Sequence, residues 1–146
     1  MDRILELYNM KNPPRHKNIS SGLYNGFEYF ILWFAGHPNA YIKIPEHHPF
    51  FKKTYSEIDD GGVVHYGFTF SGENLNKVYG LEDGWYLGWD YGHATDYINS
   101  SYSTRYPGRR WTTEDITSEC RAVIDEVIIG GKNEKTDRSA TTSASR

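Results

Sequence analysis

The sequence predicts an α+β fold, a small antiparallel sheet with a C-terminal amphipathic helix packed on one face. Residues 85–90 alternate large apolar side chains with other side chains at a period of two, which is typical of a strand. After a capping box at 112–115, apolar side chains recur at helical spacing as far as Ile128. Aromatic residues make up 16% of the chain and it holds 14 glycines, which favours sheet over a helical bundle.

The first third of the chain predicts a short helix followed by a hairpin. Residues 2–10 carry apolar side chains at spacings compatible with a short helix, and the Ser-, Asn- and Gly-rich residues 18–26 are expected to be a loop. Residues 27–34 are apolar at nearly every position, which predicts a strand buried on both faces. A turn at 36–39 and a second strand at 40–44 complete the hairpin.

The middle of the chain predicts an ordered loop and a further strand. Residues 45–49 hold two histidines between prolines, which remove backbone donors and break the sheet. Residues 63–70 alternate again, and this predicts a strand with His65 on its polar face. We expect a single domain over 1–131 and a disordered polar tail over 132–146, where no large apolar residue occurs.

Composition and charge disfavour several classes of function. The net charge is −3 and the pI is about 6.0, so no basic field favours nucleic acid as a partner. A single cysteine excludes an internal disulfide and a cysteine-based zinc site. Charged residues within the first ten positions and the shortness of the longest apolar run, 30–35, predict neither a signal peptide nor a membrane span. We therefore expect a soluble protein with no membrane partner.

Candidate functional side chains occur in the proline-flanked loop and at the ends of two predicted strands. These residues are His48, His65, Asp90, His93 and Asp96. If the strands are neighbours, the histidines and carboxylates approach one another and can bind a ligand, hold zinc, manganese or iron, or act as acid and base. The alternative is that these groups only form hydrogen bonds that fix loop geometry.

A second candidate feature is a basic segment directly before the C-terminal helix. Arg105, Arg109 and Arg110 lie among Tyr102, Tyr106 and Trp111. Guanidinium groups, aromatic faces and exposed helix N–H groups together can hold a nucleotide or another phosphorylated ligand. A solvated basic loop is the alternative, and the lack of a Gly-rich phosphate loop favours it. We nevertheless include Arg109 and Arg110 among the candidate ligand-binding residues.

Four segments carry a resemblance to a known family. They read AYIKIPEHHP (residues 40–49), VHYGFTFSG (64–72), WYLGWDYGHATD (85–96) and WTTED followed by EC (111–120). With them the chain resembles a family of small bacteriophage-encoded proteins, over about residues 40–128. Members typically read as a Gly-His-Pro loop, a His-Gly-Gly-Leu-Thr strand and a Gly-Phe-Asp-Cys-Ala-His-x-Gly-Asp segment.

The chain departs from this family pattern at three glycine positions. His47, Tyr66 and Thr95 stand where the family usually has glycine. Loss of glycine implies an altered backbone close to the candidate site and puts any inherited activity in doubt. The histidines and aspartates of the candidate site match the pattern; they are His48, His65, Asp90, His93 and Asp96.

The resemblance implies a phage or prophage gene acting in the cytoplasm of a bacterial host, where small accessory proteins often antagonise defence systems. We predict an anti-defence protein that binds a host defence protein or sequesters a nucleotide-type ligand. The alternatives are a metal-dependent hydrolase that uses the His/Asp cluster, and a module in which the cluster only fixes loops. No cofactor is predicted, apart from a divalent metal under the hydrolase alternative, and homo-oligomerisation and catalysis are left open.

Overall fold

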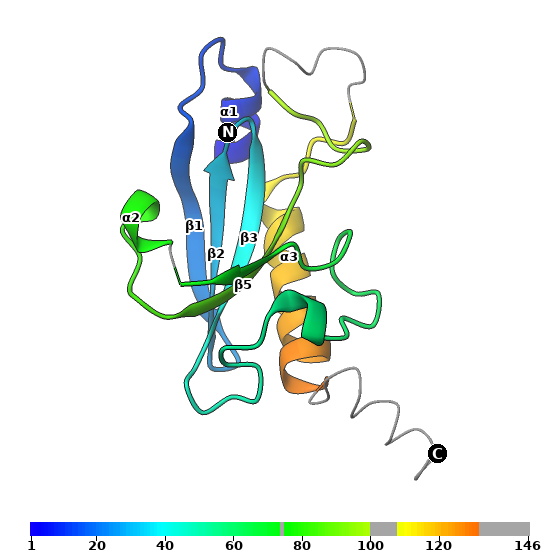
Figure 1. Cartoon of the computed structure of the whole chain (residues 1–146). Helices are drawn as coiled ribbons and strands as arrows, with labels where there is room; N and C mark the ends of the chain where they lie inside the picture. The colour runs from blue at the N-terminus through cyan, green and yellow to red at the C-terminus, as the bar shows by residue number, and fades with distance from the viewer. Residues whose placement is uncertain (74, 100–107, 132–146) are drawn as a thin grey trace.

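The protein is built around one antiparallel sheet. The structure, a computed structural model, describes residues 1–73, 75–99 and 108–131, so the predicted tail lies outside the described residues (Figure 1). The strands lie in the order β1-β2-β3-β5-β4, and every neighbouring pair is antiparallel. Their bounds are β1 (His16–Tyr24), β2 (Phe27–Phe34), β3 (His37–Ile44), β4 (Phe70–Gly72) and β5 (Trp85–Asp90).

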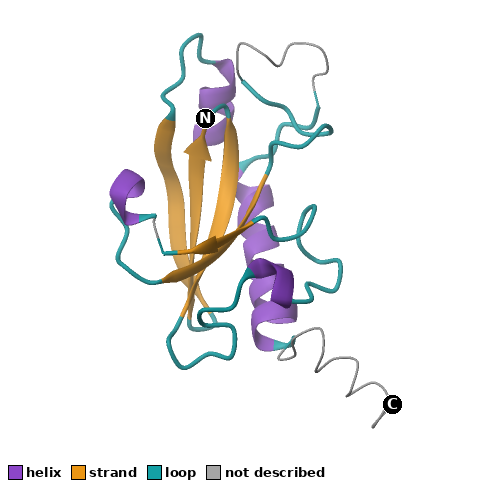
Figure 2. Ribbon diagram, in the orientation of Figure 1, coloured by secondary structure: helices purple, strands orange, loops and turns teal. Residues whose placement is uncertain are grey.

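A long C-terminal helix covers one face of this sheet (Figure 2). Helix α3 (Thr113–Val123) continues into a π-helical segment, η2 (Ile124–Ile129). The helix begins with the predicted capping box, in which Thr112 and Asp115 each accept a hydrogen bond from the backbone N–H of the other. The predicted apolar stripe is at most 1% exposed; its members are Ile116, Cys120, Val123, Ile124, Val127 and Ile128. The α+β architecture and the helix packed on one face are confirmed.

The sheet is buried on both faces, because shorter elements cover the side away from α3. Strand alternation sends Leu87 and Trp89 toward α3 and Tyr86 to the opposite face. There Tyr86 joins a second apolar cluster that includes Leu75, close to the short helix α2 (Asn76–Tyr79). Double burial explains why β2 is apolar at nearly every position, as the sequence predicted.

Two predictions for the first hairpins are corrected by the structure. Residues 18–26 were expected to be a loop, but most of them belong to β1, an edge strand whose exposed side tolerates polar residues. The turn expected at 36–39 instead centres on Ala35 and Gly36, which have positive φ, and β3 starts at His37. Tertiary pairing with β2 therefore outweighs the turn-like composition of both segments.

The strand predicted over 63–70 is also wrong. Only Phe70 of that range is in β4, and the rest is a loop of turns. Val64 and Phe68 are buried as the alternation predicted, but Tyr66 is 57% exposed. The φ angles of Tyr66 and Gly67 are +58° and +81°, which no strand permits. His65 therefore lies in a turn.

No helix in the described part of the chain combines the length and the apolar character that crossing a membrane requires.

One carboxylate near the N-terminus links two helix starts. Asp2 accepts hydrogen bonds from the backbone N–H groups of Ile4 and Leu5, which open helix α1 (Arg3–Asn9). It also accepts from the backbone N–H and the hydroxyl of Thr113, the first residue of α3. Unpaired N–H groups and the positive end of the helix dipole make each helix start a good site for an anion.

We expect Asp2→Ala to lower the free energy of unfolding by roughly 2 kcal/mol, because α1 loses its N-cap and Thr113 at the start of α3 loses two hydrogen bonds. Urea denaturation at neutral pH measures this loss. Glu6→Ala removes an exposed carboxylate from the same helix and is the matched control, with an expected change below about 0.5 kcal/mol. Equal effects of the two substitutions would contradict the shared-cap interpretation.

Candidate functional site

Asp96 is a buried carboxylate to which three separate segments of the chain are hydrogen-bonded. Its side chain is 1% exposed. The Nε2 atom of His65 lies 3.1 and 3.0 Å from its two oxygens, and Trp111 Nε1 donates to Oδ1 at 2.9 Å. The backbone N–H of His93 donates to Oδ2 at 3.0 Å. A buried carboxylate needs such a complete set of donors, so Asp96 fixes the loop of His65, the loop after β5 and the approach to α3.

His65 is held by aromatic rings as well as by Asp96. Its ring stacks on Tyr91 at 4.7 Å with an interplanar angle of 12°, and Trp111 meets it edge-on at 4.9 Å. Tyr91 is fully buried and donates from its hydroxyl to Glu119 at 2.5 Å. Burial, reinforced by the charge of Glu119, raises the pKa of Tyr91, so this phenol remains a hydrogen-bond donor.

A second histidine–carboxylate pair lies beside the first. His93 Nε2 is 3.3 Å from Asp90 Oδ1, an ion-pair distance, but the contact lacks hydrogen-bond geometry and leaves Nε2 without a hydrogen-bond partner among the described residues. Asp90 accepts instead from the backbone N–H of Gly92 and from the Thr69 hydroxyl. The His65 and His93 rings are 5.8 Å apart. Four of the predicted site residues therefore lie together, at the end of β5.

Tyr66 is the exposed member of this cluster. Its ring stacks on His93 at 4.1 Å with an interplanar angle of 16°, and its hydroxyl is 3.0 Å from the Thr95 hydroxyl. The alternation of residues 63–70 predicted Tyr66 on the buried face of a strand, so Tyr66 was not among the predicted site residues. The signal in the sequence is that the expected family pattern has glycine where this chain has Tyr66 and Thr95.

The two arginines before α3 stack on different rings. The Arg109 guanidinium lies 3.6 Å from the centroid of the Trp111 ring and 3.5 Å from Asp115. The Arg110 guanidinium lies over Tyr97 at 4.3 Å. Through Trp111, which contacts His65, Arg109 borders the cluster. Arg105, Tyr102 and Tyr106, which were predicted to accompany these arginines, lie outside the described residues.

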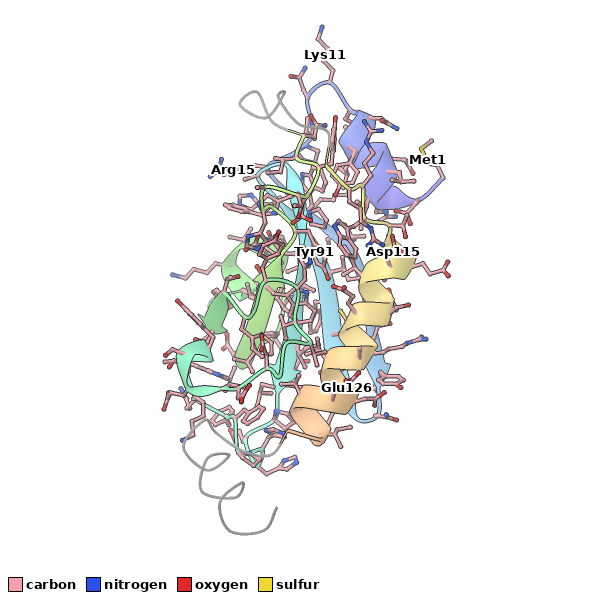
Figure 3. All side chains as sticks on the ribbon, turned by 90° about the vertical axis from the view of Figure 1, so that its right-hand side faces the viewer. Met1, Lys11, Arg15, Tyr91, Asp115 and Glu126 are labelled. Atoms are coloured by element: carbon pink, nitrogen blue, oxygen red, sulfur yellow. The ribbon has the colours of Figure 1, made fainter. Side chains whose placement is uncertain are left out.

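His48 lies apart from the other predicted site residues. Its Nε2–H donates to the carbonyl of Ile128 at 2.8 Å, and its Nδ1 accepts from the backbone N–H of Phe50 at 3.0 Å. At 1.5 Å per residue, about 25 Å of helix separates Ile128 from Trp111, which contacts His65. Figure 3 shows Asp115 near the start of α3 and Glu126 toward the opposite end of the helix, in η2. In this structure His48 satisfies a carbonyl at the helix C-terminus.

The donor geometry does not form a metal centre. Over residues 1–73, 75–99 and 108–131, no group of three or more His, Cys, Asp or Glu side chains is arranged to hold an ion. The reason is visible at the cluster, where His65 directs Nε2 at Asp96 and both oxygens of Asp96 accept hydrogen bonds. These residues therefore do not fit the metal that the hydrolase alternative requires.

Three surface cavities lie on the side of the sheet away from α3 in the described part of the chain, and two of them concern the site. The larger of these two, about 810 Å³, is lined by Glu28, Lys43 and Phe51 among others, and neither His65 nor His93 is in its lining. The smaller, about 260 Å³, borders Asp90 and Asn39. The 810 Å³ cavity and the polar cluster are therefore different places.

Comparison of the chain with protein-family models, with curated proteins and with solved structures found no match. The geometry of the cluster around Asp96 is therefore the basis for the function proposed below.

We expect Asp96→Asn to destabilise the protein by about 3 kcal/mol, because the amide places a donor against His65 or Trp111 inside the core. Chemical denaturation followed by tryptophan fluorescence measures the change. Asp90→Asn, at a half-exposed carboxylate of the same cluster, is the control and is expected to cost about 1 kcal/mol or less. A loss at Asp96 no larger than at Asp90 would show that Asp96 does not hold the loops together.

His48 predicts a specific pH dependence of stability. Desolvation lowers its pKa, and the Ile128 carbonyl only partly opposes this. The unfolded chain therefore binds a proton at His48 more readily than the folded chain. The stabilisation is present above the ordinary pKa of about 6.5 and is lost as the pH falls through the lower folded value. Compared with His48→Gln, which cannot titrate, the wild type should lose stability as the pH falls below about 7. Parallel unfolding curves for both proteins would refute this.

Proposed function

We propose that this protein binds a nucleotide-type ligand on the surface formed by Tyr66, His93, Thr95 and Arg109, here called the Tyr66 surface. The observation that carries the proposal is Tyr66 itself, an aromatic side chain that is 57% exposed although its backbone has φ +58°. A bulky residue in the left-handed region costs about 1–2 kcal/mol relative to an ordinary conformation. Such strain, held in place by surrounding structure, is a feature of binding and catalytic sites.

The side chains of the Tyr66 surface suit a base and a phosphate. The exposed face of a tyrosine ring stacks on any nucleobase, and a guanidinium donates paired N–H groups to phosphate oxygens. Arg109 is 57% exposed at its side chain and is already flattened against Trp111, so its direction is set before a ligand arrives. The hydroxyls of Tyr66 and Thr95, which lie 3.0 Å apart, add two polar groups to this surface.

Binding explains the cluster better than catalysis does. His65 and Asp96 are buried and hydrogen-bonded to each other, and Asp96 accepts from Trp111 and His93 as well. Groups used in this way position loops; they are not free to exchange protons with a substrate. Their effect is to support Tyr66, whose ring stacks on His93.

The resemblance to small phage-encoded proteins adds a biological setting to this proposal. In that setting the protein acts in a bacterial host and counters a defence system by sequestering a nucleotide signal. A host defence protein is the other partner that this setting allows. The binding experiment below separates the two.

Tyr66→Gly is expected to weaken nucleotide binding at least about tenfold, since the stacking face is lost. Its effect on stability should be within about 1 kcal/mol, because relief of the left-handed strain offsets loss of the ring contact with His93. Thermal stabilisation and calorimetric titration with mononucleotides, triphosphates and cyclic dinucleotides measure both quantities. Tyr55→Ala removes another exposed tyrosine remote from the cluster and is the matched control.

Two results of the binding experiments would contradict the proposal, and they can be distinguished from each other. If no nucleotide stabilises the wild type but a host protein co-purifies with it and is lost in Tyr66→Gly, the partner is that protein. If neither a nucleotide nor a host protein binds, or if Tyr66→Gly binds as tightly as Tyr55→Ala, the Tyr66 surface has no binding role.

A further inference from the structure

The smaller cavity lies at the end of β3 and β5, on the sheet face away from α3. Its volume is about 260 Å³. Eight residues line it: Phe34, His37, Asn39, Tyr41, Thr69, Phe70, Trp89 and Asp90. It differs from the Tyr66 surface in both position and chemistry, although Asp90 lies between the two.

Asn39 gives this cavity an unsatisfied acceptor. Asn39 is 6% exposed, and its Oδ1 has no hydrogen-bond partner among the described residues. Its Nδ2 makes one long contact of 3.5 Å with the Tyr41 hydroxyl. A buried amide oxygen without a donor is costly, and such exceptions call for an explanation. An N–H donor of a ligand reaches this atom only after a shift of the surrounding side chains, because less than 1 Å² of the oxygen is accessible.

Asp90 places negative charge beside that acceptor. Asn39 and Asp90 are directly opposite each other across β3 and β5, so their side chains are on the same face. Asp90 Oδ2 accepts from the Thr69 hydroxyl at 3.1 Å, and the Thr69 oxygen keeps lone pairs of its own. Apart from the His37 ring and the Asn39 amide N–H, the polar part of the cavity offers acceptors and one carboxylate, which favours a cation that carries several N–H donors.

The walls of the cavity suit a flat cation. Tyr41 and Phe70 meet edge to face with centroids 5.5 Å apart, so their rings form two sides of a corner. Aromatic faces attract guanidinium and ammonium groups through the ring quadrupole. Phe34 already has a guanidinium over its ring, that of Arg15 at 5.0 Å. The same mode of contact is therefore present in the chain itself at the edge of the cavity.

We propose that this cavity binds a guanidinium group, which stacks on the aromatic walls, donates to the Asp90 carboxylate and, after a small shift of the surrounding side chains, also donates to Asn39 Oδ1. Guanidinium fits better than ammonium because it is planar and carries five N–H donors in a fixed arrangement. The volume is below the range of pockets for drug-sized ligands, so a head group on a short chain fits and a nucleotide does not. The group can come from a small metabolite or from an arginine side chain of a partner protein.

N-butylguanidine tests the small-molecule source and an acetyl-Gly-Arg-Gly-amide peptide tests the side-chain source. Each is titrated against the full chain while the NMR resonances of Tyr41 and Phe70 are followed. We expect saturable shifts with at least one probe. N-butylurea, which has the same shape but is uncharged, should bind at least about tenfold more weakly than N-butylguanidine.

Variants assign the binding to this cavity. Asp90→Asn and, independently, Thr69→Val are expected to weaken the bound probe at least about tenfold and about threefold, respectively. Having both variants keeps the test decisive if one of them folds poorly, since Thr69 is exposed. Glu28→Gln removes a carboxylate from the larger cavity and is expected to leave binding unchanged. Saturable binding by neither probe up to about 10 mM, equal binding of N-butylurea, or unchanged binding in both cavity variants would overturn the proposal.

Discussion

The structure around the site depends on the burial of one charge. Asp96 is almost inaccessible to solvent, so its oxygens require donors from the protein. They obtain them from His93 in the same turn and from His65 and Trp111, which are distant in sequence. Each donor group also fixes the conformation of the segment that carries it. The His65 hydrogen bond fixes the turn that carries Tyr66, and the His93 N–H fixes the turn after β5. The Trp111 N–H fixes the segment that leads into α3, and the Arg109 guanidinium lies on the Trp111 ring. The local order of three loops is thus a consequence of satisfying one carboxylate.

This dependence explains why an exposed tyrosine can be held in a left-handed conformation. Isolated turns avoid bulky residues there. In this chain the turn is held on one side by His65 on Asp96 and on the other by the contacts of Tyr66 with His93 and Thr95. The strain is therefore local and is compensated within the cluster, which is the arrangement expected where an exposed ring has been selected for contact with another molecule.

The sequence predicted the regular, well-buried parts of the fold and not the parts made by tertiary contacts. The stripe from Ile116 to Ile128 and the alternation of 85–90 are each set by a single buried face, so period alone identifies them. β1 was missed because an edge strand with an exposed side has no such period, and 63–69 was misread because turns can also bury alternate residues. The ends of the predicted strands indicated that the histidines and aspartates lie close together. The pairing of His65 with Asp96 and the separate position of His48 depend on loop conformations, which no local sequence pattern predicts.

The alternation of β5 also explains why two different surfaces meet at its end. Successive side chains of a strand point to opposite faces, so Asp90 lies on the face of Asn39 and Tyr41, while Tyr91 lies on the face of α3 and stacks on His65. The strand thereby directs a carboxylate toward the small cavity and an aromatic ring toward the buried histidine. His93, two residues beyond Tyr91, lies between these two faces, since it is close to Asp90, to the His65 ring and to Tyr66. A ligand on either side would therefore contact residues that the same hydrogen bonds hold in place. A cation bound in the cavity at Asp90 would change the charge beside the His93 ring, on which Tyr66 stacks.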